Sequence, residues 1–109
     1  MRLSFTKSAL SDLDEIAAYI ARDHPHRAVA FVTELLSVCE RLTLAPMGYA
    51  VVGNANGREI RMRTHKRYLI FYTVTAETVE IVHVLHGSRD YAKILFPGEI
   101  YKKTDRTKD

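Results

Sequence analysis

Cysteine is nearly absent from this sequence of 109 residues, and the single copy, Cys39, cannot form a disulfide within the chain. Because Cys39 lies among leucines at helical spacing, we expect a small core residue in a reducing compartment. No apolar run reaches the roughly 20 residues that a membrane helix needs. The first ten residues also lack the continuous hydrophobic stretch of a secretion signal. These absences predict a cytoplasmic protein without membrane contact.

Recognisable motifs for metal, nucleotide or covalent chemistry are missing as well. The five histidines have no cysteines or carboxylates at ligand spacing, so we assign neither a metal nor a cofactor. Gly53 and Gly57 lie in an asparagine-rich stretch without the lysine and hydroxyl of a phosphate-binding loop. No serine or cysteine nucleophile has a base at a recognisable spacing, since Cys39 is expected in a helix core, where a thiol is inert. No catalytic residue is therefore assigned.

Positive charge is modest in total, at a net +3, but it is concentrated in one segment. The stretch "REIRMRTHKR" at 58–67 holds five cations against a single acid, Glu59. A focused patch of this kind attracts an acidic partner or a phosphate backbone. A solvated strand face explains any one of its arginines equally well. The arginines of the segment are Arg58, Arg61, Arg63 and Arg67.

Hydrophobic periodicity predicts an α+β fold in one domain, residues 1–98, that begins with a short strand at 2–5. An amphipathic helix follows it. Pro25 marks the break before a second amphipathic helix, which should end near Pro46. So short a break between two helices predicts a helical hairpin. The polar side of the first helix is expected to carry Asp12, Asp14, Glu15 and Arg22.

The second half of the chain changes from helical periodicity to strands. Glycines and asparagines between residues 48 and 57 predict an exposed, mobile loop. Strands are expected in "REIRMR", "RYLIFYTV" and "VEIVHVLH", which together form an antiparallel three-strand unit packed as a small sheet on the hairpin. A hairpin covers only one sheet face, so we expect the second face to be shallow and partly open, with the arginine-bearing strands contributing to it. Residues 99–109 have no apolar pattern and are expected to form a flexible tail.

His83 and His86 lie three residues apart in the last predicted strand, so their side chains should point to opposite faces. They cannot then act as a pair. His83 is expected on the side of Ile81 and Leu85, as a core or interface imidazole with one hydrogen bond. His86, beside Gly87 at the strand end, is expected to reach solvent.

One group of residues could cleave RNA. Attack of a ribose 2′-hydroxyl on its own phosphate needs a base, an acid and cations near the developing charge. His86 and Tyr91 could share the proton transfers, with Arg67 and Arg89 on the phosphate. However, no evident second acid or base lies beside His86, and binding an acidic partner demands less precise geometry. The spacing alone thus favours recognition over catalysis.

Three segments carry a resemblance to a known family. "ALSDLDEIAAYIARDHPHRAVAFVTELLSVCERL" resembles the helical hairpin of the RelE/ParE toxin superfamily, found in bacterial type II toxin–antitoxin modules. "KRYLIFYTV" and "VEIVHVLHGSRD" resemble its two most recognisable strands. The long hairpin and the His-Gly-Ser-Arg-Asp ending are more similar to the ParE branch, known for poisoning DNA gyrase, than to the RelE branch of ribosome-dependent mRNA endonucleases. Tyr91 follows Arg89 more closely than in the RelE pattern, whereas Arg67 matches both branches.

The resemblance implies a toxin that inhibits gyrase and is neutralised by a cognate antitoxin, whose acidic C-terminal segment folds on it. Operator DNA would be contacted only through that antitoxin. The alternative is a RelE-type nuclease with Arg67, His86, Arg89 and Tyr91 as its site. For the toxin without nuclease activity, the candidates for target contact are His86, Arg89 and Tyr91. The candidates for antitoxin binding are Arg58, Arg61, Arg63 and Arg67.

Overall fold

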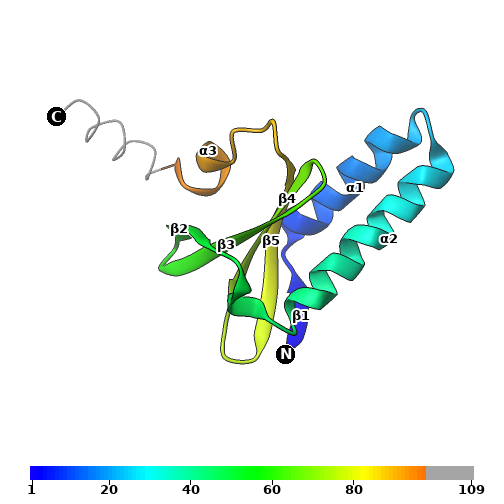
Figure 1. The fold of residues 1–109 in the computed structure, drawn as a ribbon. Helices are drawn as coiled ribbons and strands as arrows, with labels where there is room; N and C mark the ends of the chain where they lie inside the picture. The colour runs from blue at the N-terminus through cyan, green and yellow to red at the C-terminus, as the bar shows by residue number, and fades with distance from the viewer. Residues whose placement is uncertain (98–109) are drawn as a thin grey trace.

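The computed structural model describes residues 1–97 as a five-stranded sheet with a helical hairpin on one face and a short helix on the other (Figure 1). The strand order is β1-β5-β4-β3-β2, in which β1 runs parallel to β5 and all other neighbours are antiparallel. The elements are β1 (Arg2–Phe5), α1 (Lys7–Ala21), α2 (Pro25–Leu42), a 3₁₀ turn (Pro46–Gly48), β2 (Val51–Ala55), β3 (Arg58–His65), β4 (Tyr68–Val74), β5 (Thr78–His86) and α3 (Tyr91–Leu95).

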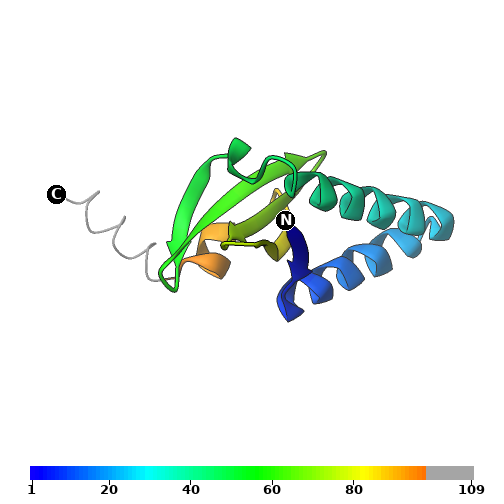
Figure 2. The ribbon, with the colours of Figure 1, turned by 90° about the horizontal axis from the view of Figure 1, so that it is seen from below.

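The predicted α+β class and helical hairpin are confirmed. The hydroxyl of Thr6 accepts a hydrogen bond from Ala9 N at 3.0 Å, which caps α1, and donates one to Val82 O at 2.9 Å. Pro25 occupies the first turn of α2, as expected of a residue whose missing N–H has no helical partner there. Seen from below, both helices run together along one side of the sheet (Figure 2). Within residues 1–97, no helix has the length and apolar character to cross a bilayer.

The main core lies between the sheet and the hairpin. Cys39 belongs to it and is fully buried, as predicted. Burial also raises the pKa of its thiol to about 11, which keeps the sulfur protonated at neutral pH. The other large side chains fully buried in this core are Leu35, Val38, Leu42, Ile70, Tyr72, Val79, Ile81 and Val84.

A second, smaller core covers the opposite face of the sheet. Ile60, Phe71, Leu85 and Phe96 form its buried centre, and α3 supplies side chains that pack against them. The segment after β5 folds back across part of the face that was expected to be shallow and partly open (Figure 1). A hollow lined by Arg58, Glu80 and Ile94 remains beside α3. Residues 99–109, predicted to be a flexible tail, lie outside the described residues.

The sheet has one strand more than expected. Residues Val51–Ala55, predicted to be part of a mobile loop, form β2 and pair antiparallel with β3. Asn56 and Gly57 make the connecting turn with positive φ values of 54° and 79°. Because an Asn–Gly pair is a strong signal for a tight hairpin, this turn could have identified β2 from the sequence.

An irregularity in β5 changes the face of His83. Tyr72 pairs with Ile81 but Phe71 pairs with His83, so Val82 has no partner in the register. The extra residue places Ile81 on the hairpin side and gives His83 the register position of Phe71, on the other side. From there the imidazole reaches Asp12 on α1. The prediction that His83 shares a side with Ile81 is therefore wrong, although it does share the side of Leu85.

Candidate functional site

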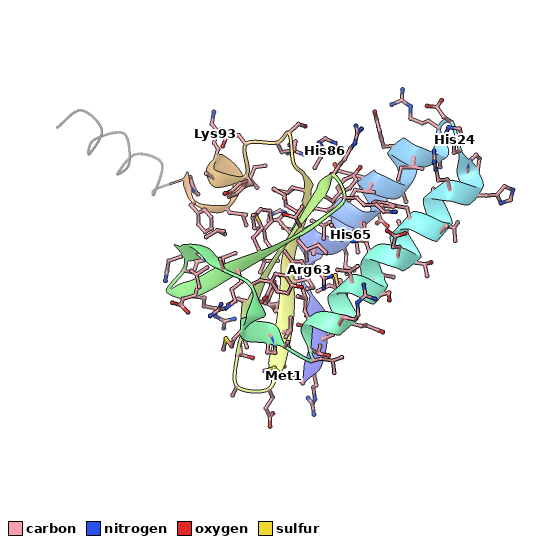
Figure 3. All side chains as sticks on the ribbon, viewed as in Figure 1. Met1, His24, Arg63, His65, His86 and Lys93 are labelled. Carbon is pink, nitrogen blue, oxygen red and sulfur yellow. The ribbon has the colours of Figure 1, made fainter. Side chains whose placement is uncertain are left out.

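A cleft of about 580 Å³ opens where α1, the β3–β4 turn and the end of β5 meet. It brings together Arg67, His86 and Arg89, three of the four residues in the predicted RNA-cleaving group. These residues come from distant parts of the sequence, and the antiparallel pairing of β4 with β5 places them together. Figure 3 shows His86 at the end of β5, on the side of the sheet where α1 lies.

A second cleft of about 380 Å³ adjoins the first and extends towards the tip of the helical hairpin. Arg67, Tyr19 and Tyr68 line both clefts, so they form the ridge between them. Burial raises the pKa of Tyr68, with a smaller contribution from Tyr19. The Tyr68 hydroxyl thus remains protonated at neutral pH. The second cleft is also lined by Ile20, Asp23, His24, Arg27, Phe31 and Lys66.

Tyr91 is not part of either cleft. It begins α3, and its ring centroid lies 4.9 Å from that of Phe71, in the small core on the opposite sheet face. Asp90 fixes this start, since its carboxylate accepts a hydrogen bond from Lys93 N at 3.3 Å. The structure thus separates Tyr91 from the other three residues of the predicted group.

The imidazole of His86 is engaged through its Nδ1 atom. This atom lies 2.8 Å from the hydroxyl of Ser88 and accepts the backbone N–H of Ser88 at 3.1 Å. In the neutral ring, accepting an N–H puts the lone pair on Nδ1 and the proton on Nε2. His86 in this arrangement offers an N–H donor at Nε2, while its Nδ1 lone pair accepts the backbone N–H of Ser88.

The four arginines of the basic segment do not form one patch. Arg61 Nη1 donates to Tyr49 O at 2.6 Å, and the guanidinium of Arg63 stacks 5.1 Å from the Tyr49 ring. Both side chains point to the hairpin side, because β3 alternates and its apolar residues are buried beneath α3. The arginine-bearing strands were expected to contribute to the face opposite the hairpin, and β3 does so through Arg58 and Ile60 but not through Arg61 or Arg63. Arg58 is on that face, 3.8 Å from Glu80, and Arg67 lies in the β3–β4 turn.

Asp12 has a structural role that the sequence pattern did not indicate. It was expected on the polar side of α1, yet it is buried. Its Oδ2 atom accepts hydrogen bonds from His83 Nδ1 at 2.7 Å and from Val84 N at 2.9 Å. The expectation of a hydrogen-bonded imidazole at His83 is thus confirmed. The sequence did offer one signal for this role: Asp12 directly precedes Leu13, on the side of the helix that faces the sheet.

Besides the contact between Asp12 and His83, a contact between the β3–β4 turn and α2 was not predicted from the sequence. Glu34 on α2 accepts hydrogen bonds from Lys66 Nζ at 2.9 Å and from His65 Nε2. The Lys66 bond, followed by the His65 bond, lowers the pKa of Glu34 from its ordinary value. The turn that holds Arg67 is therefore tied to the helical hairpin.

A mainly apolar groove of about 510 Å³ runs between α1 and α2. Small residues such as Ala17, Ala21 and Ala28 line it, and Val29 beside them is 70% exposed. In the part of the chain that the structure describes, no group of three or more histidine, cysteine, aspartate or glutamate side chains is placed to hold a metal ion.

Comparisons with known proteins agree with one another. The chain is 30% identical to Y4kP, a toxin-like protein of Sinorhizobium fredii, over 86% of this chain and 96% of that protein. Its fold matches a structure titled "Chromosomal ParDE TA system from P. aeruginosa" with a TM-score of 0.67 at 21% identity, covering 79% of this chain and 95% of the other. Residues 3–91 match the family model described as ParE toxin of type II toxin-antitoxin system, parDE. The chain therefore belongs to the ParE toxin family of type II toxin–antitoxin systems.

Proposed function

We propose that this protein inhibits DNA gyrase by binding it and does not cut nucleic acid. Membership of the ParE family supports gyrase as the target, and the state of the cleft supports binding without cleavage. The lone pair of His86 is committed to Ser88 N, and Tyr91 lies on the other face of the sheet. The predicted acid–base pair of His86 and Tyr91 is therefore not assembled in the cleft, whereas two arginines able to bind an anionic surface are.

Arg67 and Arg89 are the residues proposed to contact the target, with His86 as a hydrogen-bond donor between them. Both arginines are exposed and line the larger cleft. Neither takes part in an ion pair among residues 1–97. An arginine whose guanidinium is not engaged can form two parallel hydrogen bonds with a carboxylate or phosphate.

The test compares two activities of the purified protein. We expect it to inhibit supercoiling of relaxed plasmid by gyrase and to leave ribosome-bound mRNA intact. Arg67→Ala and Arg89→Ala should weaken the inhibition, while Arg2→Ala, an exposed arginine outside both clefts, should not. Cleavage of mRNA at the ribosomal A site, lost on Arg67→Ala substitution, would contradict this proposal and establish the RelE-type alternative.

We also propose that a cognate antitoxin neutralises the protein by laying an amphipathic segment along the groove between α1 and α2. An apolar groove with small residues at its base fits the apolar face of a helix. Of the predicted antitoxin-binding set, the antitoxin's acidic residues would meet Arg67, which is exposed in the turn tied to α2. Arg58 is also exposed, but it lies on the sheet face opposite the hairpin, 3.8 Å from Glu80, and should contribute less. Arg61 and Arg63, also in that set, are engaged with Tyr49 and should contribute less.

Substitutions on the two kinds of surface test this second proposal. Val29→Asp should weaken antitoxin binding at every salt concentration, because it places a charge on an apolar contact. Arg67→Ala should weaken it mainly at low salt, since exposed charges are screened beyond about 8 Å at physiological ionic strength. Arg58→Ala, on the opposite sheet face, should have the smaller effect. Antitoxin affinity unaffected by Val29→Asp would exclude the groove as the binding surface.

A further inference from the structure

The two-residue turn between β3 and β4 has a backbone that needs support from outside. β3 ends at His65 and β4 begins at Tyr68, so Lys66 and Arg67 form the connection. Lys66 has a φ of 54°, in the left-handed region that side chains with a Cβ atom rarely adopt. Tight hairpin turns normally place glycine or asparagine in that conformation. A lysine there implies that contacts elsewhere hold the turn.

Glu34 supplies those contacts from α2. One carboxylate oxygen, Oε2, accepts hydrogen bonds from both Lys66 and His65, the residues on either side of the β3 terminus. Phe31, one helical turn earlier, packs against the same segment: its ring centroid lies 6.4 Å from that of His65 and 5.4 Å from that of Tyr68. Figure 3 shows His65 at this junction of sheet and hairpin.

The end of β5 holds the other side of the turn. Gly87 N donates a hydrogen bond to Arg67 O at 2.7 Å. The turn is thus held from two sides: α2 binds the side chains of His65 and Lys66, and β5 is followed by the Gly87 N–H that binds the Arg67 carbonyl. The Arg67 side chain is exposed and lines both clefts.

We propose that Glu34 is a positioning residue, which fixes the β3–β4 turn so that Arg67 points into the clefts. Glu34 lines neither cleft, so it acts only through His65 and Lys66. This inference rests on the proposed role of Arg67 in contacting gyrase. It assigns to the helical hairpin a part in organising the site, in addition to its part in the core.

The first test compares two substitutions on the same helix. Glu34→Gln preserves the shape of the side chain but removes the charge that holds Lys66 and His65. Glu40→Gln changes an exposed glutamate of α2 away from the turn and is the matched control. We expect Glu34→Gln to raise the concentration needed to inhibit gyrase supercoiling about tenfold, and Glu40→Gln to leave it unchanged. Melting curves of both variants establish that they are folded.

A second measurement observes the turn directly, without gyrase. The amide hydrogen of Gly87 is protected by its bond to Arg67 O, so its exchange rate reports whether the turn is held. Exchange at Gly87 should accelerate in Glu34→Gln and not in Glu40→Gln. The double variant Glu34→Lys/Lys66→Glu restores an ion pair of reversed polarity with residue 66 but not the acceptor for His65, so it should recover slow exchange and inhibition in part.

These measurements separate failure of the positioning role from failure of the proposed target. Full inhibition by Glu34→Gln, when Arg67→Ala has lost inhibition, overturns the positioning role. Unchanged Gly87 exchange in Glu34→Gln overturns it too, whatever the target of the toxin. Inhibition by Arg67→Ala equal to that of the unsubstituted protein refutes the proposed gyrase contact, and the exchange rates then decide alone whether Glu34 holds the turn.

Discussion

The carboxylate of Asp12 on α1 lies 2.7 Å from Nδ1 of His83 on β5. The same oxygen accepts the backbone N–H of Val84 at 2.9 Å. β1 ends at Phe5, which pairs with Ile81, so beyond this point β5 has no strand on that side. Asp12 replaces the missing strand by satisfying a donor that would otherwise be buried without a partner.

Asp12→Ala should therefore destabilise the protein strongly. The substitution leaves the Val84 N–H and the His83 imidazole without their acceptor, at a cost of about 3 kcal/mol in the free energy of unfolding. Urea denaturation measures the effect. Asp14→Ala, which removes an exposed carboxylate from the same helix, is the control and should change stability by less than about 0.5 kcal/mol. Equal stabilities for the two variants would contradict a structural role for Asp12.

Gly53→Ala should displace Phe96 and loosen α3. A Cβ atom at Gly53 would lie 2.6 Å from the Phe96 ring, closer than side chains tolerate. Because Phe96 is buried in the small core, we expect a loss of about 1–3 kcal/mol in unfolding free energy. Gly48→Ala serves as the control, since a Cβ atom there would come no closer than 4.0 Å to Ala45 Cβ. A Gly53→Ala protein as stable as the Gly48→Ala protein would show that the ring moves aside without cost.

Tyr91→Phe should leave both gyrase inhibition and stability unchanged. The ring of Tyr91 packs on Phe71, and no hydrogen bond of its hydroxyl is found among the described residues. Tyr91→Ala should instead destabilise the small core by about 2–4 kcal/mol, as expected for truncation of a partly buried aromatic side chain. A loss of toxicity in Tyr91→Phe, at normal stability, would mean that the hydroxyl acts on the target.

The thiol of Cys39 should react only when the protein unfolds. Burial raises its pKa from 9.0 to about 11, so the unfolded chain releases this proton at lower pH than the folded protein does. Its contribution to stability is complete below pH 9.0 and is lost as the pH rises towards 11. Labelling with a thiol reagent, with and without denaturant, measures the reactivity. Cys39→Ala should remove this alkaline component of the stability profile; rapid labelling of the folded protein would contradict the buried position.

Much of the fold followed from local patterns. The helical hairpin was predictable because apolar residues recur at helical spacing on both sides of Pro25, whose ring and missing N–H interrupt the chain there. β4 was predictable because its run of apolar residues is buried on both faces. β2 was missed because Gly53 and Asn54 favour turns and follow only two valines, so the strand pattern is short; the Asn56–Gly57 turn was the signal that it pairs with β3.

The candidate site depended more heavily on contacts between distant segments. Arg67, His86 and Arg89 could be named from the sequence as cations and a possible base, but only the pairing of β4 with β5 brings them to one cleft. Tyr91 was separated from them because α3 folds onto the opposite face, where Phe71 and Phe96 are buried. One extra residue in β5 moved His83 away from the side of Ile81, a change that no count of alternating positions could foresee.

The sequence by itself determined the α+β class, the hairpin, the buried Cys39 and the resemblance to the RelE/ParE superfamily, because each depends on short-range periodicity or on a contiguous motif. Tertiary structure alone decided which arginines are available to a partner. In β3, burial of Ile60 beneath α3 turns Arg61 towards the hairpin, where the carbonyl of Tyr49 binds it, while Arg67 in the turn remains exposed. The physical reason is that side-chain availability depends on what the rest of the chain packs against each face, and that packing is not encoded in any single segment.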